Sequence, residues 1–228
     1  MPTESQEIIR KFTKRLTIGI GYHRELLLAV HLKRHQASLE TMLAEQFTFN
    51  SAVLWEGFLS DILLAYVVRN PAAYLKVLKS RVSQSLKDRY GSEVVKCAAL
   101  SFPPRVTRSQ ARALIDPKQF NITVESASGL SKKANELLAA TYAKKFTLSP
   151  EDAQFIDYIV AVRNYLGHRS TAARASLKSA LRPLGGINVD FQADIRDVGV
   201  YLKQRDAVGE TRAVTIALRL TEVAGHLQ

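Results

Sequence analysis

The stretch SPEDAQFIDYIVAVRNYLGH, residues 149–168, is the part of the chain that most clearly predicts its fold. Ser149 can cap a helix, Pro150 suits the first helical position, and Asp152 follows three residues after the cap. Apolar residues then recur on one face at helical spacing: Phe155, Ile159, Val162 and Leu166. This stretch therefore predicts an amphipathic helix that packs one side against a helical core.

Helical periodicity also covers most of the remaining chain. The expected helices span residues 7–46 with a break near Gly19 and Gly21, 50–68 after a cap at Asn50 and Ser51, 71–90 from Pro71 to Gly91, 107–115, 130–145, 172–181, and a last amphipathic segment after Gly209. Breakers such as Ser101-Phe-Pro-Pro104 make residues 91–129 irregular. We predict an all-α protein, a single domain over residues 1–228 built as a helical bundle, with residues 91–129 as a looped insertion.

The charge of the chain indicates a polyanionic partner. Lys and Arg total 32 against 21 Asp and Glu, a net charge of +11. Residues 69–112 hold ten basic and two acidic side chains, and residues 163–189 hold five basic and no acidic ones. Such an excess favours phosphate backbones or anionic lipid heads, although a solvated helix face has the same composition. RNA is our leading choice of partner.

Several kinds of site are disfavoured by the sequence. Cys97 is the only cysteine, so neither an internal disulfide nor a cysteine-based zinc cluster can form. His31 and His35 have a spacing that suits zinc on a helix, but no acid or further histidine completes a persuasive ligand set. Gly185-Gly186 lacks the surroundings of a phosphate loop. We expect no metal and no cofactor.

The sequence also favours a cytoplasmic protein without a membrane partner. The most apolar stretch, residues 58–68, is interrupted by Asp61 and is too short to cross a bilayer. The basic N-terminus is not followed by a long apolar run with a cleavage site.

The hexapeptide Arg163-Asn-Tyr-Leu-Gly-His168 carries residue types suited to RNA cleavage. Self-cleavage of RNA needs a base for the 2′-hydroxyl proton and positive donors for the charge on the phosphorane. Histidine titrates near neutrality and can act as base or acid, and arginine presents a fork of donors to phosphate oxygens.

The spacing within this hexapeptide limits how its residues can cooperate. Five residues of an ideal helix turn through about 140°, so Arg163 and His168 would not share a face, whereas Asn164 and His168 would. Gly167 could loosen the last turn and redirect His168. Alternatively, a dimer could bring two such motifs together in a composite cleft across a twofold axis.

The pattern Arg163-Asn164-x-x-x-His168, late on a helix of an all-α domain, resembles the catalytic motif of HEPN domains. The earlier segment around Trp55-Glu56 also resembles a HEPN helix that carries an aromatic residue followed by an acid. The resemblance loosely covers residues 50–170, and residues 91–129 have no counterpart in it.

The resemblance implies a four- or five-helix bundle, frequent homodimers, and metal-independent endoribonuclease activity that leaves 2′,3′-cyclic phosphate ends. Such domains occur in toxin–antitoxin pairs and antiviral defence, so a cognate antitoxin or regulatory protein is a further candidate partner. We expect Arg163, Asn164 and His168 to be catalytic, Arg169 and Tyr165 to contact RNA, and Glu56 to support the arginine.

Simpler interpretations stay open for each of these residues. Arg163 and His168 could be a surface arginine and a helix-terminal histidine, and Asn164, Arg169 and Glu56 ordinary polar helix residues. A half-buried packing role suits Tyr165 as well as base stacking does. Accordingly, the chain could instead be a non-catalytic HEPN-like module that binds RNA or protein, or a helical scaffold or DNA-binding protein.

Overall fold

The computed structural model of the chain describes residues 3–98, 101, 103, 105–116, 122–181, 197–206 and 209–228. Of these residues 82% are helical and none forms a strand, so the protein is all-α, as the sequence predicts. The helices are α1 (Glu4–Val30), α2 (Gln36–Arg69), α3 (Ala72–Tyr90), α4 (Ser92–Cys97), α5 (Arg108–Ile115), α6 (Ala127–Leu137), α7 (Ala140–Ala143), α8 (Pro150–His168), α9 (Thr171–Leu181), α10 (Val198–Lys203) and α11 (Arg212–His226).

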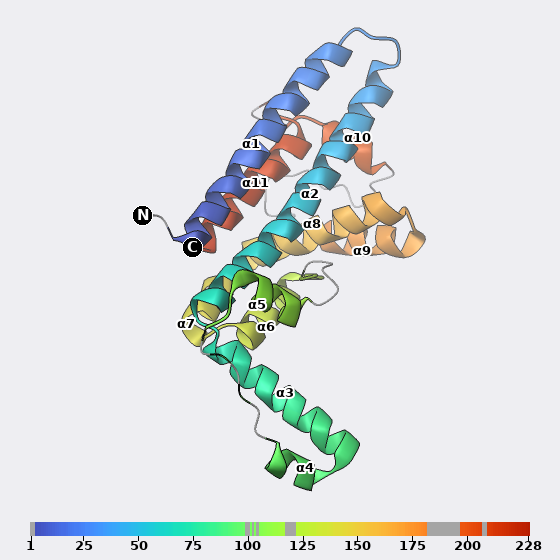
Figure 1. The fold of residues 1–228 in the computed structure, drawn as a ribbon. Coiled ribbons are helices and arrows are strands. Elements are labelled where there is room, and N and C mark those ends of the chain that lie inside the picture. Colours follow the sequence, from blue (N-terminus) through green and yellow to red (C-terminus); the bar gives the residue numbers. More distant parts are fainter. Residues whose placement is uncertain are drawn as a thin grey trace.

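Helix α2 is the centre of the molecule. It runs antiparallel to α1, and α8, α10 and α11 pack on its other sides (Figure 1). Its second half is buried almost all round, as in Leu59, Ile62, Leu63 and Leu64, which is the pattern of a helix enclosed by others. The hydroxyl of Tyr66 donates a 2.9 Å hydrogen bond to the Leu227 carbonyl and so ties the end of the chain to α2.

Two expected breaks in the first 70 residues are wrong. Helix α1 continues through Gly19 and Gly21, because a glycine inside a helix costs only about 1 kcal/mol, less than the burial of the α1 face provides. Helix α2 continues through Asn50 and Ser51. These side chains bond within the helix: Ser51 Oγ donates to the Phe47 carbonyl at 2.8 Å, and Asn50 Oδ1 accepts from Gln46 at 3.1 Å.

The actual break lies at residues 31–35, between α1 and α2, where Leu32 and His35 have positive φ angles of 61° and 66°. His31 and His35 therefore flank a turn and do not share a helix face, unlike the arrangement considered for a zinc site.

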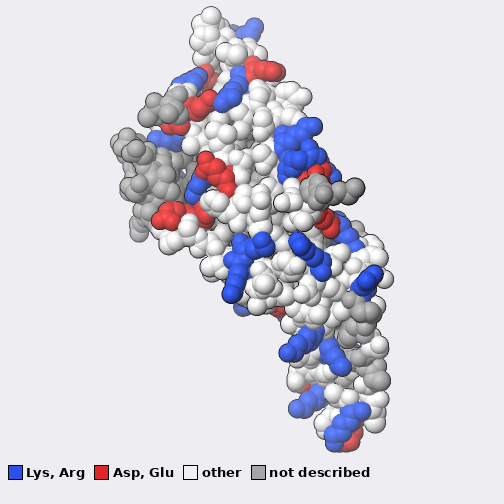
Figure 2. Space-filling model, turned by 90° about the vertical axis from the view of Figure 1, so that its left-hand side faces the viewer, with Lys and Arg blue, Asp and Glu red and all other residues white. Residues whose placement is uncertain are grey.

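Beyond α2 the chain leaves the bundle as an arm. Asn70 ends α2 and Pro71 opens α3, as predicted, and α3 stops at Gly91, where φ is 85°. Helices α3 and α4 project away from the other helices (Figure 1). On the face drawn in Figure 2, Lys and Arg outnumber Asp and Glu over this arm. Within the expected insertion, the structure describes the short helices α4 and α5 and non-helical segments between them.

The expected helix over residues 130–145 is also wrong in part. Helix α6 ends at Leu137, and an extended step at Leu138 and Ala139 separates it from α7 and a short 3-10 turn at Lys144–Phe146. This step buries Leu138 in the core. Helices α9 and α11 match their predicted positions, whereas α10 was not predicted. Arg182, Gly185 and Gly186 lie outside the described residues.

The apolar stretch over residues 58–68 belongs to a longer helix than the sequence analysis assumed. By length and composition alone, the whole of α2 is long and apolar enough to cross a membrane. Two thirds of its most apolar window is buried among the other helices, as in the core helix of a bundle.

Candidate functional site

Helix α8 carries the predicted catalytic residues, and its start matches the prediction. Ser149 Oγ accepts the Asp152 N–H at 3.1 Å, and Pro150 occupies the first position. Phe155, Ile159 and Val162 are buried. Exposure increases toward the end of the helix, where Arg163, Asn164 and Tyr165 are half-buried and His168 is exposed.

A buried carboxylate anchors the beginning of α8 to α11. Asp152, which is 3% exposed, accepts hydrogen bonds from Arg219 Nη2 at 2.6 Å and from His226 Nδ1 at 2.8 Å. Together with the buried face of α8, this contact constrains the rotation of the helix about its axis.

Arg163 meets Glu56 across the interface between α8 and α2. Arg163 Nη2 donates to Glu56 Oε2 at 3.3 Å, and Nε lies 3.1 Å from Oε1 without an aligned hydrogen bond. Burial raises the pKa of Glu56, and the positive charge of Arg163 opposes that shift. The sequence left Glu56 either as a support for the arginine or as an ordinary polar helix residue. The structure shows Glu56 in contact with Arg163.

Asn164 connects Arg163 to the side of the helix that carries His168. Its Oδ1 accepts a 3.0 Å hydrogen bond from Arg163 Nη1, and it lies one turn before His168. The arginine is therefore held by an acid on one side and by an amide on the other. The contact of Asn164 is with Arg163 alone, so the unfavourable five-residue spacing between Arg163 and His168 remains.

Of the two arrangements considered for the motif, loosening of the last turn at Gly167 does not occur. Helix α8 stays regular through His168 and ends at Arg169, which has a left-handed φ of 51° and donates its N–H to the Tyr165 carbonyl. A Cβ at Gly167 would lie 3.4 Å from Phe49, in ordinary contact, so packing does not require a glycine there. His168 is exposed and makes no hydrogen bond or ion pair with the described residues, and within one chain it does not contact Arg163.

The two predicted RNA-contact residues touch each other. The Arg169 guanidinium lies 5.4 Å from the centre of the Tyr165 ring. Arg169 also forms a two-pronged ion pair with Glu45, at 3.0 Å from Nη1 and 2.5 Å from Nη2, and this pairing raises the pKa of the guanidinium. A phosphate would have to displace Glu45 before it could use that fork.

Glu45 is the residue of this region that sequence reasoning missed. Glu45 and Glu56 are eleven residues apart, about three helical turns, so both face α8. That spacing was readable from the sequence. What was not readable is α10, whose Gly199 packs so tightly against α2 that an added Cβ would lie 2.7 Å from Glu45 Oε1. Glu45 is thereby held between α10 and Arg169.

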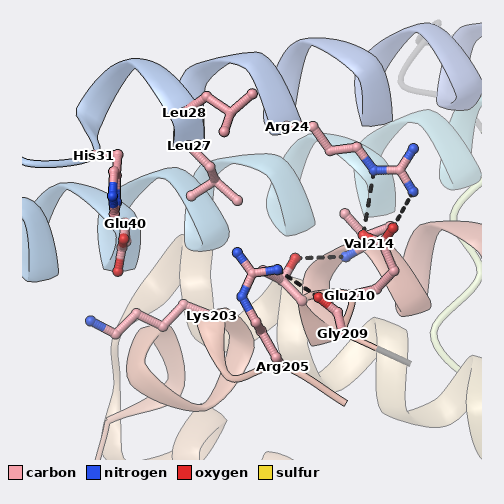
Figure 3. Close-up of a pocket in the computed structure, with 11 residues that line it drawn as sticks. Arg24, Leu27, Leu28, His31, Glu40, Lys203, Arg205, Gly209, Glu210 and Val214 are labelled. Carbon is pink, nitrogen blue, oxygen red and sulfur yellow. Dashed lines mark hydrogen bonds and ion pairs between the residues drawn. The ribbon is translucent and has the colours of Figure 1, made fainter. Parts of the chain in front are cut away.

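A separate cavity of about 290 Å³ lies between the ends of α1, α2, α10 and α11 (Figure 3). Its charged groups are largely engaged. Arg24 pairs with Glu210 at 2.5 Å, Arg205 Nη1 donates to the Gly209 carbonyl at 2.6 Å, and Lys203 Nζ donates to the Ala37 carbonyl at 2.7 Å. None of the predicted site residues lines this cavity. Within the described part of the chain, no group of three or more His, Cys, Asp or Glu could hold a metal ion.

Comparisons of the chain with family models, with curated proteins and with solved structures find no match.

Proposed function

We propose that this protein is a HEPN-type endoribonuclease that cleaves RNA through Arg163, Asn164 and His168 without a metal cofactor. One observation supports this most strongly. Glu56 and Arg163, which carry the two separate parts of the resemblance and lie 107 positions apart in the chain, are in contact. A chance motif gives no reason for the acid after Trp55 to meet the motif arginine.

The proposed chemistry is attack of a ribose 2′-oxygen on the adjacent phosphorus. The O2′–P bond forms, the P–O5′ bond breaks, and the products carry a 2′,3′-cyclic phosphate and a 5′-hydroxyl. His168 transfers a proton at the 2′-hydroxyl or at the leaving oxygen, which its exposure permits. Arg163 stabilises the charge on the phosphorane, and Asn164 orients the guanidinium through the 3.0 Å hydrogen bond.

The proposed fold is a HEPN-like bundle in which α1, α2, α8, α10 and α11 form the core, with residues 91–129 as the insertion in a single domain. The active form we propose is a homodimer, because one chain does not bring His168 and Arg163 together. In a dimer, the second chain would place its own Arg163 and His168 opposite those of the first chain across a twofold axis. A cytoplasmic protein with a cognate antitoxin or regulatory partner, as a toxin or antiviral effector, is the setting that we propose.

The second candidate is a non-catalytic HEPN-like module that binds RNA or protein. The ion pairs of Arg163 with Glu56 and of Arg169 with Glu45 favour it, because both guanidiniums already have acidic partners. The Arg163–Glu56 pair has the longer contacts, 3.1 and 3.3 Å against 3.0 and 2.5 Å for Arg169–Glu45. Arg163 can therefore turn toward a phosphate more easily than Arg169, as the nuclease proposal requires. A module of this kind would bind RNA and leave it intact.

Incubation of the pure protein with total cellular RNA tests the proposal. We expect cleavage that persists in EDTA, products with 2′,3′-cyclic phosphate ends, and RNA affinity that falls steeply with added salt. The matched control for Arg163→Ala/His168→Ala is Arg34→Ala/His31→Ala, which removes the same two residue types from exposed positions between α1 and α2. RNA that is bound but uncut by the parent would favour the second candidate.

A further inference from the structure

A long groove between α1 and α2 is not used by the proposed reaction. It consists of two adjoining cavities, of about 620 Å³ and 310 Å³, which share Arg15 and Leu54. On α1 the groove extends from Ile8 to Leu26, about 27 Å along the helix axis. It therefore matches a helix of about five turns.

The groove is apolar along its length. Apolar side chains that face it are substantially exposed: Ile18 (45%), Tyr22 (63%), Leu26 (48%) and Val53 (43%). A row of exposed apolar side chains along a concave surface is typical of a site for another apolar surface. Gly57 of α2 also lines the groove, and a Cβ there would meet nothing within 4 Å, so the space above it is open.

The edge of the groove is basic. Lys11, Lys14 and Arg15 line it. Among the described residues, Lys14 and Arg15 make no ion pair, and Lys11 has only a 3.7 Å contact with Glu7. The one acidic side chain in the same part of the groove, Asp61, pairs with Arg108 at 2.6 Å. An occupant consequently meets positive charge that is not neutralised within the chain.

We propose that this groove binds an acidic amphipathic helix of a partner protein. The apolar stripe of such a helix would cover the exposed side chains of α1 and α2, and its acidic flank would pair with Lys14 and Arg15. The net charge of +11 adds long-range attraction for an acidic partner. This proposal does not depend on the nuclease activity.

Two other occupants fit the groove less well. A second copy of this chain, docked about a twofold axis that passes near Lys14 and Arg15, would place one basic edge against the other, which is repulsive. Single-stranded RNA needs exposed aromatic faces on which its bases can stack. Phe12 and Phe58 are each only 4% exposed, and Phe47 stacks on His23 at 4.5 Å, so Tyr22 alone among these aromatic residues offers a free face.

The test uses fluorescence anisotropy with a labelled synthetic helix of about 18 residues, which carries a leucine stripe flanked by glutamates. We expect it to bind the parent protein at least about tenfold more tightly than the same peptide with lysines in place of glutamates. Gly57→Leu, which fills the groove without an internal clash at Cβ, should weaken binding about tenfold or more.

Charge reversal provides a second, independent variant. Lys14→Glu/Arg15→Glu should weaken binding about tenfold, whereas Lys76→Glu/Lys79→Glu, an equal charge change on exposed positions of α3, should leave it nearly unchanged. Circular dichroism and thermal melting of each variant show whether it is folded. Gly225→Leu on α11, where a Cβ would also meet nothing within 4 Å, controls for the glycine substitution.

Three results would overturn the proposal: acidic and basic peptides that bind equally, binding that is insensitive to Gly57→Leu, or equal losses in the two charge-reversal variants. If analytical ultracentrifugation shows that the parent protein is a dimer and that Gly57→Leu is a monomer, the groove would be assigned to a second copy instead. Loss of binding to an RNA oligonucleotide in Gly57→Leu, with peptide binding absent, would assign it to RNA. Failure of the nuclease assay, by contrast, leaves these peptide measurements unaffected.

Discussion

Gly199→Ala should destabilise the protein although alanine favours helices. The new Cβ would lie 2.7 Å from Glu45 Oε1 and closer still to Thr41 Cγ2, where ordinary carbon contacts are about 3.5–4.0 Å. Neither neighbour moves freely. The Thr41 hydroxyl donates to the Ala37 carbonyl at 2.8 Å, and Glu45 is held by Arg169.

The expected cost follows from these contacts. Overpacking of this kind typically costs about 1–3 kcal/mol, and the gain in helix propensity returns about 0.5–1 kcal/mol. Taking the middle of each range, we expect a net loss of about 1 kcal/mol in the free energy of unfolding, measured by urea denaturation. Relief of the clash also displaces Glu45 from Arg169, which leaves the Arg169 guanidinium available to a phosphate, so RNA affinity should not fall.

Gly21→Ala is the matched control. Gly21 lies inside α1, and a Cβ there meets nothing within 4 Å, so the same substitution should raise the free energy of unfolding by about 0.5–1 kcal/mol. Opposite signs for the two variants are the expected result. If Gly199→Ala is as stable as the parent, the close packing of α10 on α2 is wrong, and with it the account of how Glu45 is held.

Three further predictions concern titratable groups. Glu56→Gln should lower the free energy of unfolding by only about 0.5–1 kcal/mol, because solvent screens its pair with Arg163, while RNA cleavage falls more than RNA binding. Asp152→Asn should lower it by about 1–3 kcal/mol, because Arg219 loses its buried partner. Burial lowers the pKa of His23 from 6.5 to about 4, so the unfolded chain takes up this proton first. The free energy of unfolding is therefore highest above pH 6.5 and decreases as the pH falls toward 4, by up to about 3 kcal/mol while water stays excluded from the His23 ring.

Each of these predictions has its own control. Glu151→Gln changes an exposed acid in the first turn of α8, so it should leave cleavage unchanged and cost at most the helix-dipole contribution of about 0.3–1 kcal/mol. An equal loss of cleavage in Glu56→Gln and Glu151→Gln would contradict the proposed role of Glu56. A mild effect of Asp152→Asn, like that of Glu151→Gln, would show that Arg219 needs no buried partner. His23→Leu should remove the part of the pH dependence between 6.5 and 4, and an unchanged pH profile would refute its assignment to His23.

The parts of the fold that could be predicted from the sequence are those fixed by local chemistry. Ser149, Pro150 and Asp152 specify the start of α8 by capping, and Asn70-Pro71 and Gly91 delimit α3 by backbone restrictions. These signals act within one turn, and at these positions the tertiary contacts agree with them.

The parts that could not be predicted depend on tertiary contacts. Gly19 and Asn50 are local signals for a break, yet packing of α1 on α2 keeps both helices continuous. The prediction of Arg163, Asn164 and His168 as catalytic residues rests on residue type, spacing and the motif resemblance. Glu45 was missed because its partner, Arg169, lies 124 positions away and depends on where α8 ends.

Digestion of a defined RNA by the parent protein, by Arg163→Ala/His168→Ala and by the Arg34→Ala/His31→Ala control tests the central claim most directly. With EDTA present, the account predicts that the parent and the control release fragments with 2′,3′-cyclic phosphate ends, while the motif variant, folded by circular dichroism, releases none. Equal digestion by all three proteins would contradict the assignment of the α8 motif as the catalytic site.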